Sequence, residues 1–182
     1  SYCAFYQFEN LTNVKINDGI TEVGTAAFGL CENLTKVELP NSISSIGNSS
    51  FYGCKKLKDL VIPNKVTMID TGAFTDCESL TDINIPNSVT ELGTSVFSRC
   101  INLKSVSLPS GITSIPDTTF YLCRNLTDVN IPDSVGNIGE YAFCLCESLD
   151  QIEIPNTVKE IGKNAFYNCE SIKSINIPNG IT

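Results

Sequence analysis

The stretch that decides the fold is CESLTDINIPNSVTELGTSVF, which runs from Cys77 to Phe97. It contains the spacing L-x-x-I-x-I followed by proline, then a second apolar pair, a glycine and a phenylalanine. The unit recurs along the 182-residue chain, so that phenylalanine returns every 23 residues, at Phe5, Phe28, Phe51, Phe74, Phe97, Phe120, Phe143 and Phe166. A period of this length is typical of proteins built from stacked repeats. The sequence therefore predicts a solenoid, not one or two globular domains.

The apolar spacing predicts the strands of this solenoid. Val14–Ile16 and its equivalents are short, β-branched and alternating, which favours a strand in each repeat. Stacking in register makes these strands a parallel sheet with neighbours about 4.8 Å apart. Proline follows most of them and ends the strand, because it has no N–H for the ladder. Segments such as Val89–Leu92 are expected to form a second extended stretch.

The remaining part of each repeat is expected to turn the chain. Five repeats carry glycine in one column, at Gly24, Gly47, Gly93, Gly139 and Gly162, and we expect an unusual backbone angle there. Asp70 and Pro116 depart from this column, so the turn should differ in their repeats. A single helical turn is expected around Ala142–Phe143, with the phenylalanine as the deep core anchor.

The pattern resembles the leucine-rich repeats of the BspA-like family. Its hallmark is an L-x-x-I-x-I-P strand followed by S-V-T-x-I-G-x-x-A-F-x-x-C, which Val135–Cys146 (VGNIGEYAFCLC) and Val158–Cys169 (VKEIGKNAFYNC) match at nearly every position. The resemblance covers residues 1–182 as a single leucine-rich repeat domain of about eight repeats. It implies a curved right-handed array with a parallel sheet on the concave face and short turns or extended segments on the convex side. It also implies a secreted or surface-exposed protein of bacteria or protists, often an adhesin, without a common catalytic residue.

Composition excludes several classes of protein. Hydrophobic residues make up 42% of the chain, enough for a continuous core, and the longest apolar runs are too short to span a membrane. The net charge is −8 without a basic cluster, which argues against nucleic acid and anionic lipid as partners. No leader resembling a signal peptide opens the chain. Both ends fall inside repeats and neither resembles a polar cap, so we expect an excerpt of a longer array.

Cysteine is the residue type that most needs an explanation. Seven of the nine cysteines occupy one repeat column, where Phe8 stands in the first unit, and this favours buried reduced thiols over disulfides. Cys3 and Cys144 lie off the column, and we expect Cys144 to react first because it follows the core phenylalanine. The chain has no histidine and no C-x-x-C pair, so no metal site, cofactor or catalytic centre is predicted.

Two surfaces are candidates for binding. The first consists of outward residues of the strands, expected on the concave face: Asp59, Asp82, Asn84, Ser105, Ser107, Asp128 and Asn130. It has no aromatic anchor, so a plain solvated sheet is the alternative. The second consists of Tyr52, Tyr121 and Tyr167, in the column after the core phenylalanine. Those tyrosines are also well suited to cap the edge of the core, because the ring packs while its hydroxyl stays wet.

These observations predict a non-enzymatic repeat module that binds a protein or glycan. The surface or secreted location, and the adhesin-type role, come from the family resemblance alone. Two alternatives stay open: an intracellular interaction scaffold, which buried reduced thiols suit equally well, and a structural spacer that carries another domain.

Overall fold

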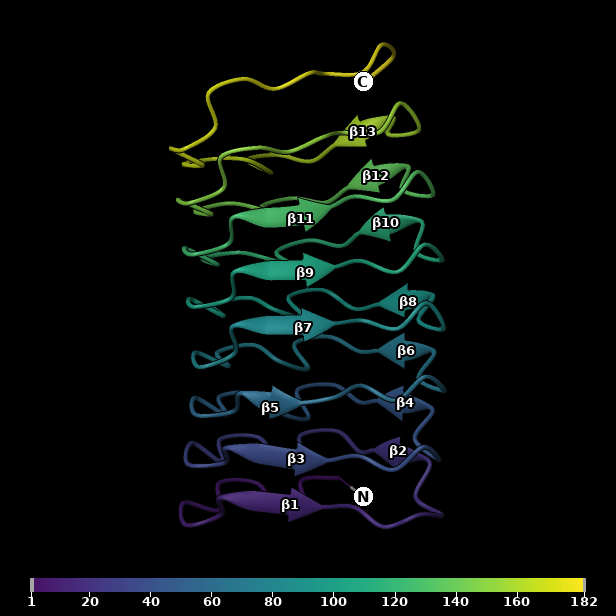
Figure 1. The fold of residues 1–182 in the computed structure, drawn as a ribbon, viewed down its shortest axis with the longest axis vertical. Coiled ribbons are helices and arrows are strands. Elements are labelled where there is room, and N and C mark those ends of the chain that lie inside the picture. Colours follow the sequence, from purple (N-terminus) through teal and green to yellow (C-terminus); the bar gives the residue numbers. More distant parts are fainter. Residues whose placement is uncertain (1, 182) are drawn as a thin grey trace.

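The computed structural model describes residues 2–181 as a stack of similar rungs, each rung being one 23-residue repeat counted from Leu11 (Figure 1). Each rung runs outward along a first column of strands and returns along a second. The first column contains β1 (Asn13–Lys15), β3 (Lys36–Glu38), β5 (Asp59–Leu60), β7 (Asp82–Asn84), β9 (Ser105–Ser107) and β11 (Asp128–Asn130). The second contains β2 (Glu22–Val23), β4 (Ser45–Ile46), β6 (Met68–Ile69), β8 (Glu91–Leu92), β10 (Ser114–Ile115), β12 (Asn137–Ile138) and β13 (Glu160–Ile161). The strand pairs of both columns are parallel, which confirms the parallel-sheet solenoid and its second extended segment.

The expectation of eight strands in one first-column sheet is wrong. Within residues 2–181 this column holds two three-stranded sheets, β1-β3-β5 and β7-β9-β11, and residues 151–153 and 174–176 form no strand. The ladder stops between β5 and β7, where Asp59 and Asp82 are neighbours in the outward column. Like charges on adjacent strands destabilise pairing, and no other step of this column places two acids together. Nothing in the structure explains the missing strands at 151–153 and 174–176.

The second column is also interrupted, between β8 and β10, and here the cause is a proline. The amide of Gly93 donates to the carbonyl of Ile69 at 2.8 Å, and Gly139 donates to Ile115 at 2.8 Å. Pro116 is the equivalent residue between them, and it has no N–H to give to the preceding rung. The expectation of a different turn is confirmed at Pro116 as the loss of this hydrogen bond. It is wrong at Asp70, whose amide donates to the carbonyl of Ile46 at 2.9 Å as Gly93 and Gly139 do in their rungs.

The glycine column has a different physical reason from the one expected. Positive φ occurs at Gly19, Gly53, Gly72 and Gly180, and at none of the five glycines of the expected column. A Cβ built on Gly93 would instead lie 2.2 Å from the backbone nitrogen of Thr71, in the rung before. The column selects glycine because two backbones approach too closely for a side chain.

No helical turn forms at Ala142–Phe143, so that expectation is wrong. Tyr141 and Leu145 have left-handed φ values of 55° and 63°, and residues two before and two after the core phenylalanine repeat this along the stack. The amide of Phe143 donates to the carbonyl of Ala165 in the next rung at 2.8 Å, whereas Cys144 donates within its own rung to Tyr141. In a helix, every one of these N–H groups would donate to a carbonyl of the same rung. Here alternate N–H groups donate to the neighbouring rung instead.

The core is a column of stacked phenylalanine rings. Phe51, Phe74, Phe97, Phe120 and Phe143 are fully buried. Rings of successive rungs stack with centroids 5.2 to 5.8 Å apart, from Phe5 to Phe166. The leucine column and the inward residues of the strands complete one continuous apolar cluster. This confirms phenylalanine as the core anchor of each repeat.

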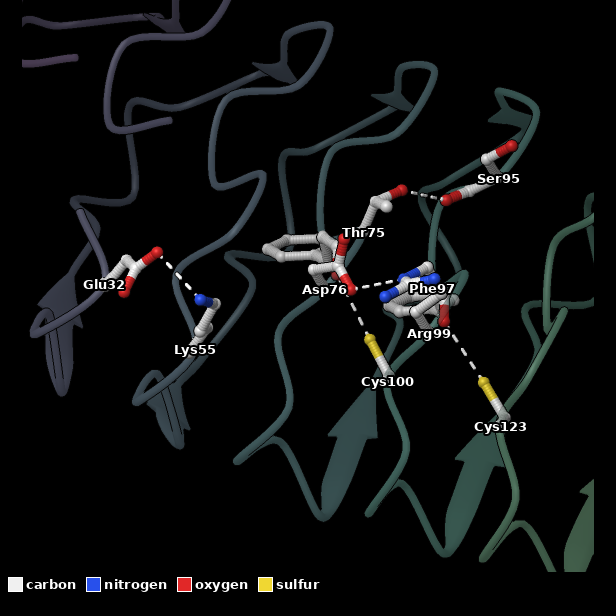
Figure 2. Close-up of polar contacts among 10 residues, drawn as sticks. Glu32, Lys55, Thr75, Asp76, Ser95, Phe97, Arg99, Cys100 and Cys123 are labelled. Carbon is white, nitrogen blue, oxygen red and sulfur yellow. Dashed lines mark hydrogen bonds and ion pairs between the residues drawn. The ribbon is translucent and has the colours of Figure 1, made fainter. Parts of the chain in front are cut away.

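Each column cysteine donates a hydrogen bond from its thiol to the carbonyl of a core phenylalanine. The thiol of Cys123 donates to the carbonyl of Phe97 at 3.1 Å, and Cys100 donates to Phe74 at 3.1 Å (Figure 2). Each column cysteine repeats this bond, with lengths of 3.0 to 3.3 Å. All nine cysteines are free thiols. The residue is thus a hydrogen-bond donor between rungs as well as a small apolar side chain.

Two expectations about individual thiols need correction. Cys144 is 3% exposed, so it does not lie on the accessible side of Phe143. It occupies a column between Tyr121 and Tyr167, which elsewhere also contains both small residues and tyrosines. Cys169 is only half-buried although it belongs to the column, because the core thins at that end of the described chain. Cys3 and Cys169 are the more accessible thiols.

Candidate functional site

The structure brings most of the first candidate surface together on one sheet. In β7-β9-β11, Asp82 is in register with Ser105 and Asp128. The second outward column of the same sheet contains Asn84, Ser107 and Asn130. All six side chains are exposed except Ser105, which is half-buried and donates its hydroxyl to Asp82 Oδ1 at 2.9 Å. The result is a flat polar face without an aromatic side chain.

Asp59, the seventh candidate, lies in the neighbouring sheet and has a different setting. It is in register with Lys36, whose Nζ forms an ion pair with Glu38 Oε1 at 2.8 Å. Glu38 is the main cause of the raised pKa of Lys36, and the negative charge of Asp59 adds to it. Lys36 in turn lowers the pKa of Glu38. The β1-β3-β5 sheet therefore has mixed charge, whereas β7-β9-β11 carries carboxylates without a base.

Sequence reasoning missed one exposed apolar residue on this face. Val61 is 80% exposed in the second outward column, immediately after β5. A β-branched residue at an outward strand position was the available signal.

The tyrosine column does not form a single patch. Tyr52 and Tyr121 are half-buried and lie three rungs apart, about 14 Å at 4.8 Å per rung. Tyr167 is 59% exposed at the C-terminal end of the stack. In the same column, the ring of Tyr6 lies against Gly29, where a Cβ would come within 2.9 Å of it. This arrangement favours tyrosines that cover small residues of the next rung, the second of the two interpretations considered from sequence.

Grooves at the carboxyl ends of the first-column strands were not predicted. One of about 400 Å³ is lined by Lys15, Asp18 and Glu38 among others, and one of about 490 Å³ by Lys36, Lys58 and Asp59. A third, of about 550 Å³, spans rungs 6 to 8 and is lined by Asn130, Ile131, Pro132, Asp133, Ile152, Glu153, Ile154, Pro155, Asn156 and Asn176. The signal in the sequence was the polar residue that follows each strand-ending proline.

Ion pairs occupy the loop edge next to the cysteine column, formed by residues immediately before or after the cysteines. Lys55 pairs with Glu32 at 2.8 Å, and Arg99 pairs with Asp76 at 2.6 Å (Figure 2). The Asp76 carboxylate is the main cause of the raised pKa of Arg99. Each pair joins residues one rung apart, so these charges largely compensate one another along the stack. This edge offers less free charge than the strand face.

Residues 2–181 include neither a candidate metal cluster nor a candidate membrane-spanning helix. No group of three or more histidine, cysteine, aspartate or glutamate side chains in residues 2–181 is placed to hold a metal ion. Across the same range, no helix is long and apolar enough to span a bilayer.

Comparison with solved structures identifies similar stacks. A leucine-rich repeat protein of T. pallidum is 33% identical with a TM-score of 0.83, over 90% of this chain and 79% of that protein. A leucine-rich repeat protein of Bacteroides ovatus is 34% identical with a TM-score of 0.55, over 94% of this chain and 56% of that protein. A leucine-rich cell surface protein of Faecalibacterium prausnitzii is 27% identical with a TM-score of 0.65, over 94% of this chain. The chain spans 61% of the length of that cell surface protein.

Comparison with protein families gives the assignment. A search among curated proteins found no significant match. The BspA type leucine-rich repeat region, in 6 copies, matches residues 1–126 and 113–182. The two ranges together cover the chain, in agreement with the 23-residue register and the parallel stack. The chain therefore belongs to the BspA type leucine-rich repeat family.

Proposed function

We propose that this chain is a non-enzymatic module that binds a protein or glycan through the outward face of its first-column strands, within a cell-surface or secreted adhesin-type protein. The observation that carries the proposal is the row of exposed Asp82 and Asp128, with half-buried Ser105 between them, beside exposed Asn84 and Asn130. These groups are held in fixed register by parallel pairing. Rigid presentation of polar groups reduces the entropy lost on binding.

The location is supported by one comparison. The Faecalibacterium prausnitzii protein, described as a cell surface protein, shares the fold at 27% identity. Binding through many modest polar contacts suits such a setting, because an extended face can be repeated along an array.

Charge reversal on the sheet face tests the proposal. The probes are a glycan array and a panel of immobilised extracellular-matrix proteins. The double substitution Asp59→Lys and Asp82→Lys should weaken binding at least tenfold for any probe that the unaltered chain binds. It should leave the unfolding midpoint nearly unchanged. Binding of the unaltered chain should also weaken with added salt, since exposed charges are screened beyond about 8–10 Å near physiological ionic strength.

The matched control reverses two acids on the second column, Glu22→Lys and Glu91→Lys, for the same change in net charge. Both residues are exposed. An equal loss in the control would mean that only net charge matters, which contradicts a site on the first column. Binding that survives the Asp59 and Asp82 substitutions would move the site elsewhere, first to the tyrosine column. The proposal itself would be contradicted if the unaltered chain bound neither the glycans nor the matrix proteins.

A further inference from the structure

The 550 Å³ groove on rungs 6 to 8 differs in charge from its counterparts on rungs 1 to 3. All three grooves lie at the carboxyl ends of first-column strands, so the backbone that builds them is similar. Those on rungs 1 to 3 contain Lys15, Lys36 or Lys58 together with acids. The groove on rungs 6 to 8 contains two carboxylates and three amides, and no basic residue lines it.

Neither carboxylate of this groove is held in an ion pair by the described residues, although Lys159 lies at its edge. Asp133 and Glu153 are both exposed, and neither forms an ion pair within residues 2–181. Lys159 donates to the backbone carbonyl of Asn156 at 3.2 Å and is not among the lining residues. Arg124, the one base between residues 105 and 158, pairs with Glu147 at 3.5 Å.

The surroundings concentrate negative charge on the groove. Rungs 6 to 8, residues 126–182, contain eight acids and three bases, so they supply five of the eight net negative charges of the chain. A groove lined by one sign of charge focuses the field on an approaching ligand of opposite sign.

The backbone at this groove is also open. No backbone hydrogen bond joins residues 128–130 to residues 151–153 among those of the described chain, although the equivalent residues of β9 and β11 are paired. The backbone of this step therefore lacks the inter-rung ladder that β9 and β11 have.

We propose that this groove binds an arginine side chain from an extended segment of a protein partner. The inference rests on the proposed function and names the partner class for its C-terminal part. Arginine fits better than lysine because its planar guanidinium has five donors and can engage several carboxylate and amide oxygens at once. The groove volume is within the usual range for a bound side chain and its flanking backbone. No aromatic side chain lines the groove, so a sugar ring has no face to stack on.

An NMR titration of the described chain tests this proposal. The probe is an acetylated, amidated peptide Gly-Arg-Gly-Arg-Gly, and its neutral counterpart has citrulline in place of arginine. The arginine peptide should cause saturable shifts of the backbone amides of residues 130–133 and 152–156, together with the side-chain amides of Asn130, Asn156 and Asn176. The citrulline peptide should bind at least tenfold more weakly, because it keeps the shape and loses the charge.

Matched variants separate this groove from general acidity. Asp133→Asn with Glu153→Gln should weaken the arginine peptide at least tenfold, whereas Asp18→Asn with Glu38→Gln, in the mixed-charge groove of rungs 1 and 2, should leave its affinity unchanged. Both pairs remove the same net charge from exposed positions. The second pair of substitutions also removes the Lys36–Glu38 ion pair, which is exposed and contributes little to stability, so neither variant should alter folding. Equal effects of the two pairs, equal binding of the citrulline peptide, or shifts without saturation would overturn the proposal.

The outcome is distinguishable from failure of the proposed function. If the arginine peptide does not bind while the matrix-protein or glycan panel still depends on Asp59 and Asp82, only the assignment of this groove fails. If the peptide binds in the groove and the chain binds no matrix protein or glycan of the panel, the proposed surface function is contradicted and the assignment of the groove is kept.

Discussion

At the residue scale, each core phenylalanine serves two neighbours at once. Its ring stacks on the rings of the rungs before and after it, while its carbonyl accepts the thiol of the next rung. The carbonyl of Phe74, for example, accepts the amide of Cys77 at 3.2 Å and the thiol of Cys100 at 3.1 Å. Both lone pairs of this buried acceptor are therefore used, although one partner is enough to satisfy a buried carbonyl.

Truncating one ring tests the core. Phe97→Ala should reduce the free energy of unfolding by about 3–5 kcal/mol, because it removes a fully buried aromatic and leaves a cavity. Urea unfolding measures the loss. Asn84→Ala, on the exposed face, is the control and should change stability by less than about 0.5 kcal/mol. Similar losses from the two variants would mean that the strand faces are inverted.

Replacing one thiol by a methyl pair tests the donor role. Cys100→Val keeps an apolar side chain of similar size and removes the bond to Phe74, so it should cost about 0.5–1.5 kcal/mol. Cys144→Val is the control, because Cys144 is buried without a thiol hydrogen bond among the described residues. Equal stabilities of the two variants by urea unfolding would show that the column cysteine is only a space-filling residue.

At the element scale, the strands are too short to hold together alone. Each contains two or three residues, and the turn segments between them contribute inter-rung hydrogen bonds of their own. The ladders can therefore stop at Pro116, or between Asp59 and Asp82, without breaking the stack. Backbone hydrogen bonds of the phenylalanine segment continue across both interruptions. The amide of Asp76 donates to the carbonyl of Ser98, and the amide of Phe97 donates to the carbonyl of Thr119.

Adding one methyl group tests the close approach of neighbouring turns. Gly93→Ala should destabilise the chain by about 1–3 kcal/mol or more, because its Cβ would collide with the backbone of Thr71. Gly136→Ala is the matched control, since its Cβ would meet the carbonyls of Thr113 and Thr157 at an ordinary 3.9 Å. Thermal unfolding compares the two. A neutral Gly93→Ala would contradict the packing of these turns.

At the scale of the whole molecule, buried thiols link stability to pH. Burial raises the pKa of Cys77 and Cys123 well above its ordinary value, and raises that of half-buried Cys169 to about 11. In the unfolded chain a thiol titrates near 8.5. Below that pH both states keep the proton and the full stability is present. Above it only the unfolded state loses protons, so stability falls as pH rises toward the folded-state pKa.

Alkaline unfolding tests this linkage. Each fully buried thiol should lower the free energy of unfolding by about 1.4 kcal/mol per pH unit above its unfolded pKa. Urea unfolding at several pH values between 7 and 10 gives the slope for the chain, and Cys77→Val with Cys123→Val should make it visibly shallower. Parallel slopes in the two proteins would mean that these thiols ionise in the folded state, which contradicts their burial.

The sequence by itself determined the stack, the parallel register, the phenylalanine core and the family. A 23-residue period places equivalent residues above one another, so one repeat read correctly predicts them all. It also predicted the altered turn at Pro116, because a missing N–H is a property of the residue alone. Asp82, Ser105 and Asp128 were found together for the same reason: alternation within a strand decides which side chains face outward.

Only the tertiary structure decided how the rungs are joined. The thiol bond to a phenylalanine carbonyl connects residues 26 apart, and the clash at Gly93 arises between two backbones in different rungs. The thiol bond, the close approach and the left-handed φ values, as at Tyr141 and Leu145, recur from rung to rung, and they are contacts and backbone angles that a list of apolar positions does not contain. The burial of Cys144, the break at Asp59 and the groove at Asp133 and Glu153 depend instead on which different residue stands one rung away, and a consensus of one repeat averages those differences out.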